Sequence, residues 1–331
     1  MTDVARNPAK PCVTIGFVAK EKFHLAASAL ETLLATLPAP ETIPCEVIVV
    51  DCNTPVRYRA QLADVMARWS RVNFRVVSSE RFLQPNQARN LVARHARHDY
   101  MAFVENDSFV PAGWLEAMLE VCLTYPKGCV VFPEMFEGPA DRGLPHVDVA
   151  ITHIVTRREK GRVIREFVRD ESALTRHLHP RCQVVDASEA HVLLCSREVF
   201  NRFGGFDERI STREHCDLAL SLHEVGIPLI VNGHVRASFY PAPPVQPDER
   251  GFFRFVWDVG AARRSLEHLT EKWNLVNFPS SLGFVRSQAF RTHHLGWRAF
   301  AAARRRLSLL GKFFDDKPIS SPSPGRKAPR N

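Results

Sequence analysis

The chain has 331 residues, with 45% hydrophobic and 24% charged side chains and a net charge of +8, which is typical of a globular protein. No run of about 18 uncharged apolar residues and no apolar N-terminal segment occurs, so neither a transmembrane helix nor a secretory signal is expected. The eight cysteines include no Cys-x-x-Cys pair, which disfavours a zinc cluster or a disulfide framework, and we expect a cytoplasmic protein.

Short apolar segments alternate with amphipathic segments over the first 125 residues. The apolar segments are too short for helices, whereas the amphipathic segments repeat apolar residues at spacings of three and four. This alternation predicts βαβ units and a mostly parallel sheet, the α/β class. Strands are expected at residues 12–18, 46–50, 73–77 and 100–104, and helices at residues 21–37, 58–69, from 85 onward and at 111–122.

Acidic residues stand where two of these strands end. Asp51 closes the second strand, and Glu105-Asn106-Asp107 follows the fourth. Ligands of open α/β sheets bind at the carboxyl ends of the strands, and two carboxylates flanking an amide suit a hard divalent cation that carries phosphate. The same residue types are also ordinary turn residues. The chain lacks Gly-x-Gly-x-x-Gly after the first strand and any Walker-type phosphate loop, which disfavours a Rossmann dehydrogenase and a P-loop kinase.

The second half of the chain is less regular. Residues 134–190 show no clear periodicity, and a lid, an acceptor surface or an insertion are all open interpretations. Beyond them we expect a strand at residues 191–195, a short helix capped by Ser196, a glycine turn at 204–205, a helix opening at Ser211 and a strand pair at 229–231 and 235–240. The apolar segment 252–257 is expected to pack back on the main domain.

The segment that opens the helix near Ser211 has two interpretations. Ser211 and Glu214 have the spacing of a capping box, in which the Glu214 carboxylate accepts from the Ser211 amide, and Asp217 would favour the helix start. Alternatively, His215 stands between carboxylates just after a glycine turn, and such a histidine suits a general base near neutral pH.

Positive charge is concentrated at the C-terminal end. Residues 251–331 contain fifteen Lys and Arg against five acids, whereas the rest contains twenty-nine against thirty-one. Residues 296–314 form an amphipathic basic pattern that suits either packing on the protein or an anionic membrane, so 296–331 is a candidate for peripheral contact with the inner face of a membrane. No nucleic acid is expected as a partner, because aromatic residues do not alternate with basic ones there.

Taken in order, several segments resemble the family 2 glycosyltransferases of the GT-A fold. The resemblance implies a Rossmann-like, mostly parallel central sheet flanked by helices, with a C-terminal helical extension. It divides the chain into a flexible N-terminus (1–10), a GT-A domain (11–245, with a nucleotide-binding half at 11–125 and an acceptor half at 126–245), a helical region (246–315) and a disordered basic tail (316–331). The matching segments are Val-Ile-Val-Val-Asp51, Asn86-Gln-Ala-Arg89-Asn90, Glu105-Asn106-Asp107 at the DxD motif, Phe203-Gly-Gly-Phe-Asp-Glu208 and Glu214-His215-Cys216-Asp217-Leu218.

The resemblance also implies a reaction. It is the transfer of a sugar, as in a hexosyltransferase, from a nucleoside diphosphate sugar, usually a UDP-sugar, to a hydroxyl of a carbohydrate or other acceptor, usually with inversion and with Mn²⁺ or Mg²⁺. The metal would be bound by Asp107 and Glu105, and His234 is a candidate third ligand. The implied catalytic residues are His215, Glu214 and Asp217, and the implied donor-binding residues are Ala19, Asp51, Arg89, Asn90, Glu105, Asn106 and Asp107.

The chain departs from the family pattern at three points. Glu105 replaces the first aspartate of the DxD motif, and Ala19-Lys20-Glu21-Lys22-Phe23 replaces the usual Pro-x-Tyr-Asn after the first strand. His215 stands where the family has its base aspartate. Either His215 takes over as the base, which we favour, or Glu214 does, or the enzyme is slow or inactive. The competing hypothesis is therefore a catalytically inactive GT-A-like scaffold or binding subunit.

Overall fold

The computed structural model describes residues 10–138, 144–145, 152–170, 181–240 and 245–275, together with residues 283, 285, 286 and 288. Its first half follows the predicted alternation, and strands β3, β2, β1 and β4 lie side by side and run parallel. The elements are β1 (Val13–Val18), α1 (Phe23–Ala35), β2 (Cys45–Cys52), α2 (Val56–Arg68), β3 (Asn73–Ser79), α3 (Pro85–His95) and β4 (Tyr100–Glu105).

The second half extends the same sheet. The strand order continues from β4 through β11, β6 and β12 to β10, with β11 antiparallel to both of its neighbours and β12 parallel to β6. The sheet is therefore mixed but mostly parallel, as predicted. The elements are β5 (Ser108–Phe109), α4 (Trp114–Thr124), β6 (Val130–Glu137), β7 (Leu144–Pro145), β8 (Thr152–Glu159), β9 (Arg162–Arg169), β10 (Cys182–Val185), β11 (Val192–Ser196), α5 (Arg197–Phe203), α6 (Glu214–Glu224), β12 (Leu229–Phe239), a 3-10 turn (Pro247–Glu249), α7 (Arg250–Val256) and α8 (Val259–Trp273).

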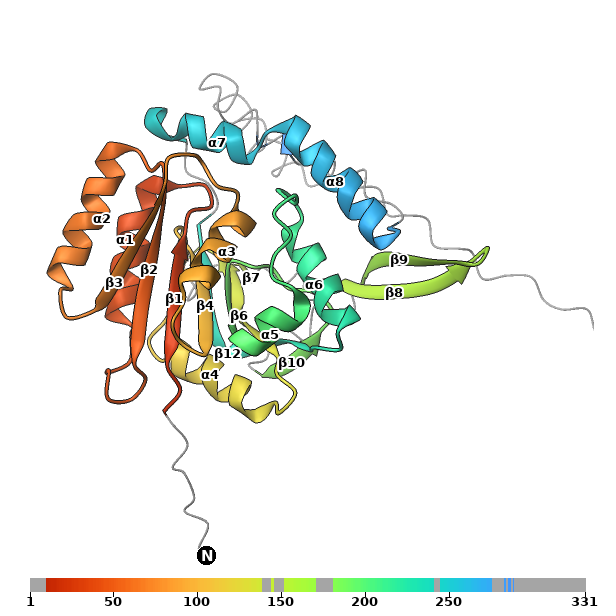
Figure 1. Ribbon diagram of the computed structural model, residues 1–331, viewed down its shortest axis with the longest axis horizontal. Coiled ribbons are helices and arrows are strands. Elements are labelled where there is room, and N and C mark those ends of the chain that lie inside the picture. Colours follow the sequence, from red (N-terminus) through yellow and green to blue (C-terminus); the bar gives the residue numbers. More distant parts are fainter. Residues whose placement is uncertain are drawn as a thin grey trace, which may run out of the picture.

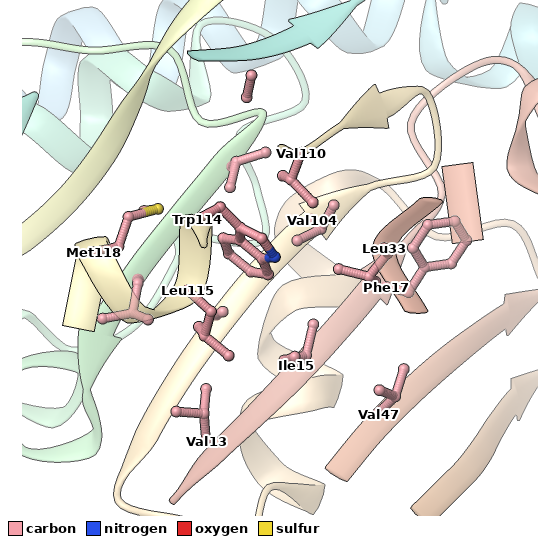
Figure 2. Close-up of a cluster of buried hydrophobic side chains, with 14 of the residues drawn as sticks. Val13, Ile15, Phe17, Leu33, Val47, Val104, Val110, Trp114, Leu115 and Met118 are labelled. Carbon is pink, nitrogen blue, oxygen red and sulfur yellow. The ribbon is translucent and has the colours of Figure 1, made fainter. Parts of the chain in front are cut away.

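Helices cover both faces of the sheet. One apolar core joins the strands to α1, α2 and α4, and a second joins them to α3, α5 and α6. Such double coverage explains why the strands are nearly continuous apolar runs. Figure 2 shows the first core, in which the fully buried ring of Trp114 lies close to Val104, Val110 and Leu115. A buried ring of this kind contributes about 3–5 kcal/mol relative to alanine.

A glycine on β1 lets α3 lie close against the sheet. A Cβ atom at Gly16 would stand 2.5 Å from Cγ1 of Val92 on α3, closer than packed carbon atoms approach. Helix α3 begins with a capping box between Gln84 and Gln87, with Pro85 in the first turn. These features hold the helix that carries Arg89 at a fixed height above the carboxyl end of β4.

Two predictions for the second half were wrong. The described part of residues 134–190 is not irregular, because β8 and β9 form an antiparallel hairpin that extends at the right of Figure 1. Most of its side chains are exposed, so it lacks the apolar periodicity of a buried strand, and only Ile154 and Phe167 contact the core next to α6 and α8. The strand pair at 229–231 and 235–240 is the single strand β12, whose register against β6 shifts between Asn232 and Arg236.

The described C-terminal segments lie above the carboxyl ends of the parallel strands (Figure 1). Phe252 of α7 packs against Phe23 with ring centroids 4.7 Å apart, so this segment returns to the main domain as predicted. Glu249 accepts hydrogen bonds from the backbone N–H of His24 at 2.6 Å and from its ring, and so caps the start of α1. No helix among the described residues has the length and apolarity to cross a membrane. The predicted helix at 296–314, the tail at 316–331 and residues 1–9 lie outside the described residues.

Candidate functional site

The loops after β1 and β4 are joined by Asn106. Its backbone N–H donates to the carbonyl of Val18 at 2.9 Å, and its side-chain oxygen accepts from the backbone N–H of Lys20 at 2.9 Å. The Asn106 side chain is 2% exposed. Because these two bonds fix one loop on the other, Lys20 and Lys22 are brought beside Glu105 and Asp107.

Glu105 ends β4 and is surrounded by cations. Its Oε1 accepts from Arg89 Nη2 at 2.6 Å, its Oε2 lies 2.7 Å from His191 Nδ1, and Lys20 Nζ is 3.7 Å away. Arg89 is fully buried and also donates to the carbonyl of Ala190 at 2.8 Å. The sequence analysis named Arg89 as a donor-binding residue, and the structure shows that its guanidinium pairs with Glu105.

Asp107 has one paired and one open oxygen. Its Oδ2 accepts from Lys22 Nζ at 2.6 Å, and Lys22 also donates to the carbonyl of Tyr240 at 3.0 Å. Its Oδ1 is buried and finds no hydrogen-bond partner among the described residues. A buried carboxylate oxygen of this kind is suited to an additional positive ligand.

Three side chains could hold a metal ion together. Within the described part of the chain, Glu105, Asp107 and His191 can each offer one ligand atom, and these atoms lie within 4.8 Å of one another. Two carboxylates and an imidazole are a donor set that Mn²⁺ accepts, so the residues present fit the cation implied by the sequence.

The histidine of this group differs from the one that the sequence analysis named. His191 lies just before β11, and its ring stacks on Phe239 at a centroid distance of 4.4 Å. His234 is exposed on β12, within the stretch between Asn232 and Arg236 where the register against β6 shifts, and it is not part of this group. The only available signal for His191 was its place directly before an apolar strand.

The charges of this group sustain one another. Burial by itself would lower the pKa values of Lys20 and Lys22, but the acids beside each lysine together outweigh it and raise both values, chiefly Glu105 for Lys20 and Asp107 for Lys22. Burial would likewise lower the pKa of His191, but Glu105 and Glu189 together raise it to about 10. Burial would raise the pKa of Asp107, which Lys22 lowers. All four groups are therefore charged at neutral pH.

The predicted capping box at Ser211 does not form. Arg213 adopts a left-handed conformation with φ 59° at the start of α6, and the Ser211 amide donates to Ser265 Oγ at 3.1 Å. Glu214 is turned toward the acids and pairs with Lys20. Burial would raise the pKa of Glu214, but Lys20 and Arg89 together with other neighbours outweigh it and lower the pKa to about 2.

His215 is a buried neighbour of this group. It is 7% exposed, and burial lowers the pKa of its imidazole below the usual 6.5. After burial, the largest influences on the pKa of His215 are the charges of Glu189, Arg213, Glu214 and Lys20. The ring is therefore neutral at pH 7 and able to accept a proton.

Other predicted residues hold neighbouring segments. Asp217 accepts from Trp273 Nε1 at 2.7 Å and from Lys272 at 2.8 Å, which ties α6 to α8. Asn90 exchanges two hydrogen bonds with the backbone of Phe206 and so fixes the glycine turn on α3. Asp51 accepts from the Thr54 amide and pairs with Arg59, and Ala19 is buried in the apolar cluster under α7.

Comparisons with known proteins complete this description. Residues 18–188 match the family model described as Glycosyl transferase family 2. No curated protein sequence matches the chain.

Solved structures are similar in fold. GalNAc-T7 with UDP, GalNAc and Mn²⁺ is 13% identical with a TM-score of 0.52, over 75% of this chain and 48% of that one, so this chain spans about half of its length. A mannosyltransferase from Pyrobaculum calidifontis in complex with GDP-Man and Mn²⁺ is 15% identical with a TM-score of 0.50, over 93% of this chain and 81% of that one. These likenesses confirm the predicted GT-A type of fold.

Proposed function

The chain belongs to glycosyl transferase family 2, and we propose that it transfers a sugar, such as a hexose, from a nucleoside diphosphate sugar to an acceptor hydroxyl. The observation that carries the proposal is the convergence of Glu105, Asp107 and His191 within 4.8 Å at the carboxyl end of β4, beside two lysines. A UDP-sugar is the proposed donor, with Asp51 accepting from the base. The acceptor is a carbohydrate or another hydroxyl compound.

Asp107 and Glu105 are the proposed metal ligands. His191 would take the third place that the sequence analysis gave to His234 after releasing the proton that its pairing with Glu105 holds on the ring. When bound there, Mn²⁺ or Mg²⁺ offsets the negative charge that develops on the departing diphosphate. Asn106 joins the loop that carries Glu105 and Asp107 to the loop that carries Lys20 and Lys22. Arg89 positions Glu105, and Lys20 and Lys22 supply positive charge next to the phosphates.

His215 is the proposed general base. The acceptor oxygen forms a bond to the anomeric carbon, the bond from that carbon to the diphosphate oxygen breaks, and the hydroxyl proton passes to the His215 imidazole. Base and leaving group then lie on opposite faces of the sugar, so the configuration inverts. Glu214 is the weaker candidate, because its pairing with Lys20 holds its pKa at about 2.

A thermal-shift panel tests the donor site. Nucleoside diphosphates and nucleotide sugars are added with and without Mn²⁺ to wild type, to Asp107→Asn and to Asp64→Asn, an exposed residue of α2 that serves as control. A donor at a hundredfold excess over its Kd stabilises the folded protein by about 2.7 kcal/mol, which is readily detected. We expect a metal-dependent shift with one nucleotide in wild type and Asp64→Asn but not in Asp107→Asn.

One observation favours a second candidate, a catalytically inactive scaffold. Lys22 already pairs with Asp107, the residue on which metal binding depends. The negative charge of the site is therefore neutralised by the chain itself, without a bound metal ion. The scaffold is distinguished by its lack of turnover. A metal-dependent shift with a nucleotide sugar that is never hydrolysed or transferred, across a panel of acceptors, would favour it.

A further inference from the structure

Lys20 and Lys22, which follow β1, depart from the family pattern, and the proposed reaction gives them no role beyond positive charge next to the phosphates. Lys22 is 6% exposed and pairs with Asp107, and Lys20 lies between Glu105 and Glu214. Glu105 is also paired with Arg89. Each of the three carboxylates that converge here therefore has a cation of the chain itself as its partner.

Such pairing resists either ligand on its own. A divalent cation that takes Asp107 must separate it from Lys22 and leave a buried ammonium without its counter-ion, which is unfavourable. A nucleoside diphosphate that enters alone brings negative charge next to Glu105 and Asp107. When the divalent cation and the nucleoside diphosphate bind together, every charge keeps a partner. The carboxylates then bind the cation, and the lysines pair with the phosphates.

We propose that Lys22 is a resident counter-ion that moves from Asp107 to the donor diphosphate, so that the divalent cation and the donor bind as a pair and each binds weakly without the other. This inference rests on the proposed function and describes how the divalent cation and the donor enter the proposed active site. Lys22 can make this exchange because its flexible side chain also donates to the Tyr240 carbonyl, a neutral acceptor that stays available. Thermodynamic linkage then requires the coupling to be equal in both directions.

The test is a calorimetric titration of Mn²⁺ into wild type, Lys22→Met and Lys22→Arg, each with and without saturating UDP and, in parallel, GDP. In wild type we expect the effective nucleotide to tighten Mn²⁺ binding at least about tenfold. In Lys22→Met we expect Mn²⁺ alone to bind at least about tenfold tighter than in wild type, because Asp107 is already free. The coupling should be smaller than in wild type but not zero, because the nucleotide still brings negative charge next to Glu105 and Asp107. Lys22→Arg keeps the positive charge and is expected to behave as wild type.

A matched control is Lys127→Met. Lys127 is exposed between α4 and β6, and β6 runs parallel to β4, so this residue lies at the opposite edge of the sheet from Asp107. Its substitution is expected to leave every titration unchanged. Tighter Mn²⁺ binding in Lys22→Met also separates the proposed exchange from mere damage to the fold, which would weaken binding.

Several results would overturn the inference. It fails if Lys22→Met binds Mn²⁺ no better than wild type, if wild type binds Mn²⁺ alone as tightly as it does with a nucleotide that itself binds, or if Mn²⁺ binds none of the proteins under any condition. Failure of the proposed function looks different. In that case neither UDP nor GDP binds, while the nucleotide-free titrations still report whether Lys22 competes with Mn²⁺.

Discussion

Two groups of acidic residues in this molecule come from similar sequence motifs but have different hydrogen-bond and ion-pair partners. The central acid group comprises Glu105, Asp107 and Glu214, and the α8 anchor comprises Asp207 and Asp217. All five come from segments that resemble motifs of the same family, and all five accept from cationic side chains.

The partners distinguish the groups. The α8 anchor is bound mainly by one helix, through His268, Lys272 and the neutral Trp273 Nε1, which satisfies Asp217 as a structural contact. The central acid group draws its cations from separate segments, and Asp107 keeps an open oxygen. An acidic motif residue whose partners come mainly from one helix has a structural role. An acidic motif residue whose partners come from several segments belongs to a candidate functional site.

The largest effect is expected at Glu105. Glu105→Gln leaves Arg89 and His191 as buried cations without their carboxylate, which should lower the free energy of unfolding by about 3–5 kcal/mol. Urea unfolding at pH 7 measures this loss. Glu120→Gln, at an exposed position of α4, is the control, and an equal loss in both variants would contradict the comparison.

Removal of the base should follow in size. His215→Gln is expected to lower kcat roughly a hundredfold, about 2.7 kcal/mol in the barrier, while the nucleotide thermal shift is retained. Because burial lowers the pKa of His215, its imidazole accepts a proton above that lowered pKa. The wild-type rate should therefore fall only as pH drops below 6.5, through the titration of a ring that Glu189, Arg213, Glu214 and Lys20 surround.

Glu214→Gln decides between the two candidate bases. It should keep the acid limb of the rate profile, whereas His215→Gln should lose it. The reverse result would assign the base to Glu214.

A smaller effect, on stability, is expected in the α8 anchor. Asp217→Asn keeps an acceptor for Trp273 but loses the ion pair with Lys272, and should cost about 1–2 kcal/mol in the free energy of unfolding. Turnover, once corrected for folded protein, should be nearly unchanged. A large fall in kcat at an unchanged Tm would instead support the catalytic role that the sequence suggested for Asp217.

Asp207→Asn should have the smallest effect, under about 1 kcal/mol. Its pair with Arg209 is exposed, its pairs with His268 and Lys272 are partly exposed, and the asparagine oxygen still accepts hydrogen bonds from them. Burial would raise the pKa of Asp207, but His268 and Arg209 outweigh it and lower the pKa below 3.8. The stabilisation is thus present above pH 3.8 and lost as pH falls further. Urea unfolding of wild type and Asp207→Asn at pH 7 and pH 3 should show a smaller difference in the free energy of unfolding at pH 3.

The central site was predictable from the sequence only in part. Glu105-Asn106-Asp107 was found because it follows a short apolar strand, and in a parallel sheet such strand ends share one edge. His191 was missed, since it reaches Glu105 only through the antiparallel pairing of β11 with β4. Lys20 and Lys22 were noted as a departure, but Glu214, which pairs with Lys20, lies 194 residues away along the chain, and Asp107, which pairs with Lys22, lies 85 residues away.

The sequence by itself determined the α/β class, the alternation of strands and helices in the first half and the position of the acids at strand ends. These follow from short continuous apolar runs and from the apolar period of 3.6 residues within single segments. Only the tertiary structure decided the partner of each acid. The left-handed Arg213 turned Glu214 from the Ser211 amide to Lys20, and α8 took Asp217. Buried charge must be neutralised by whatever cation the fold brings within reach, and local patterns do not encode that proximity.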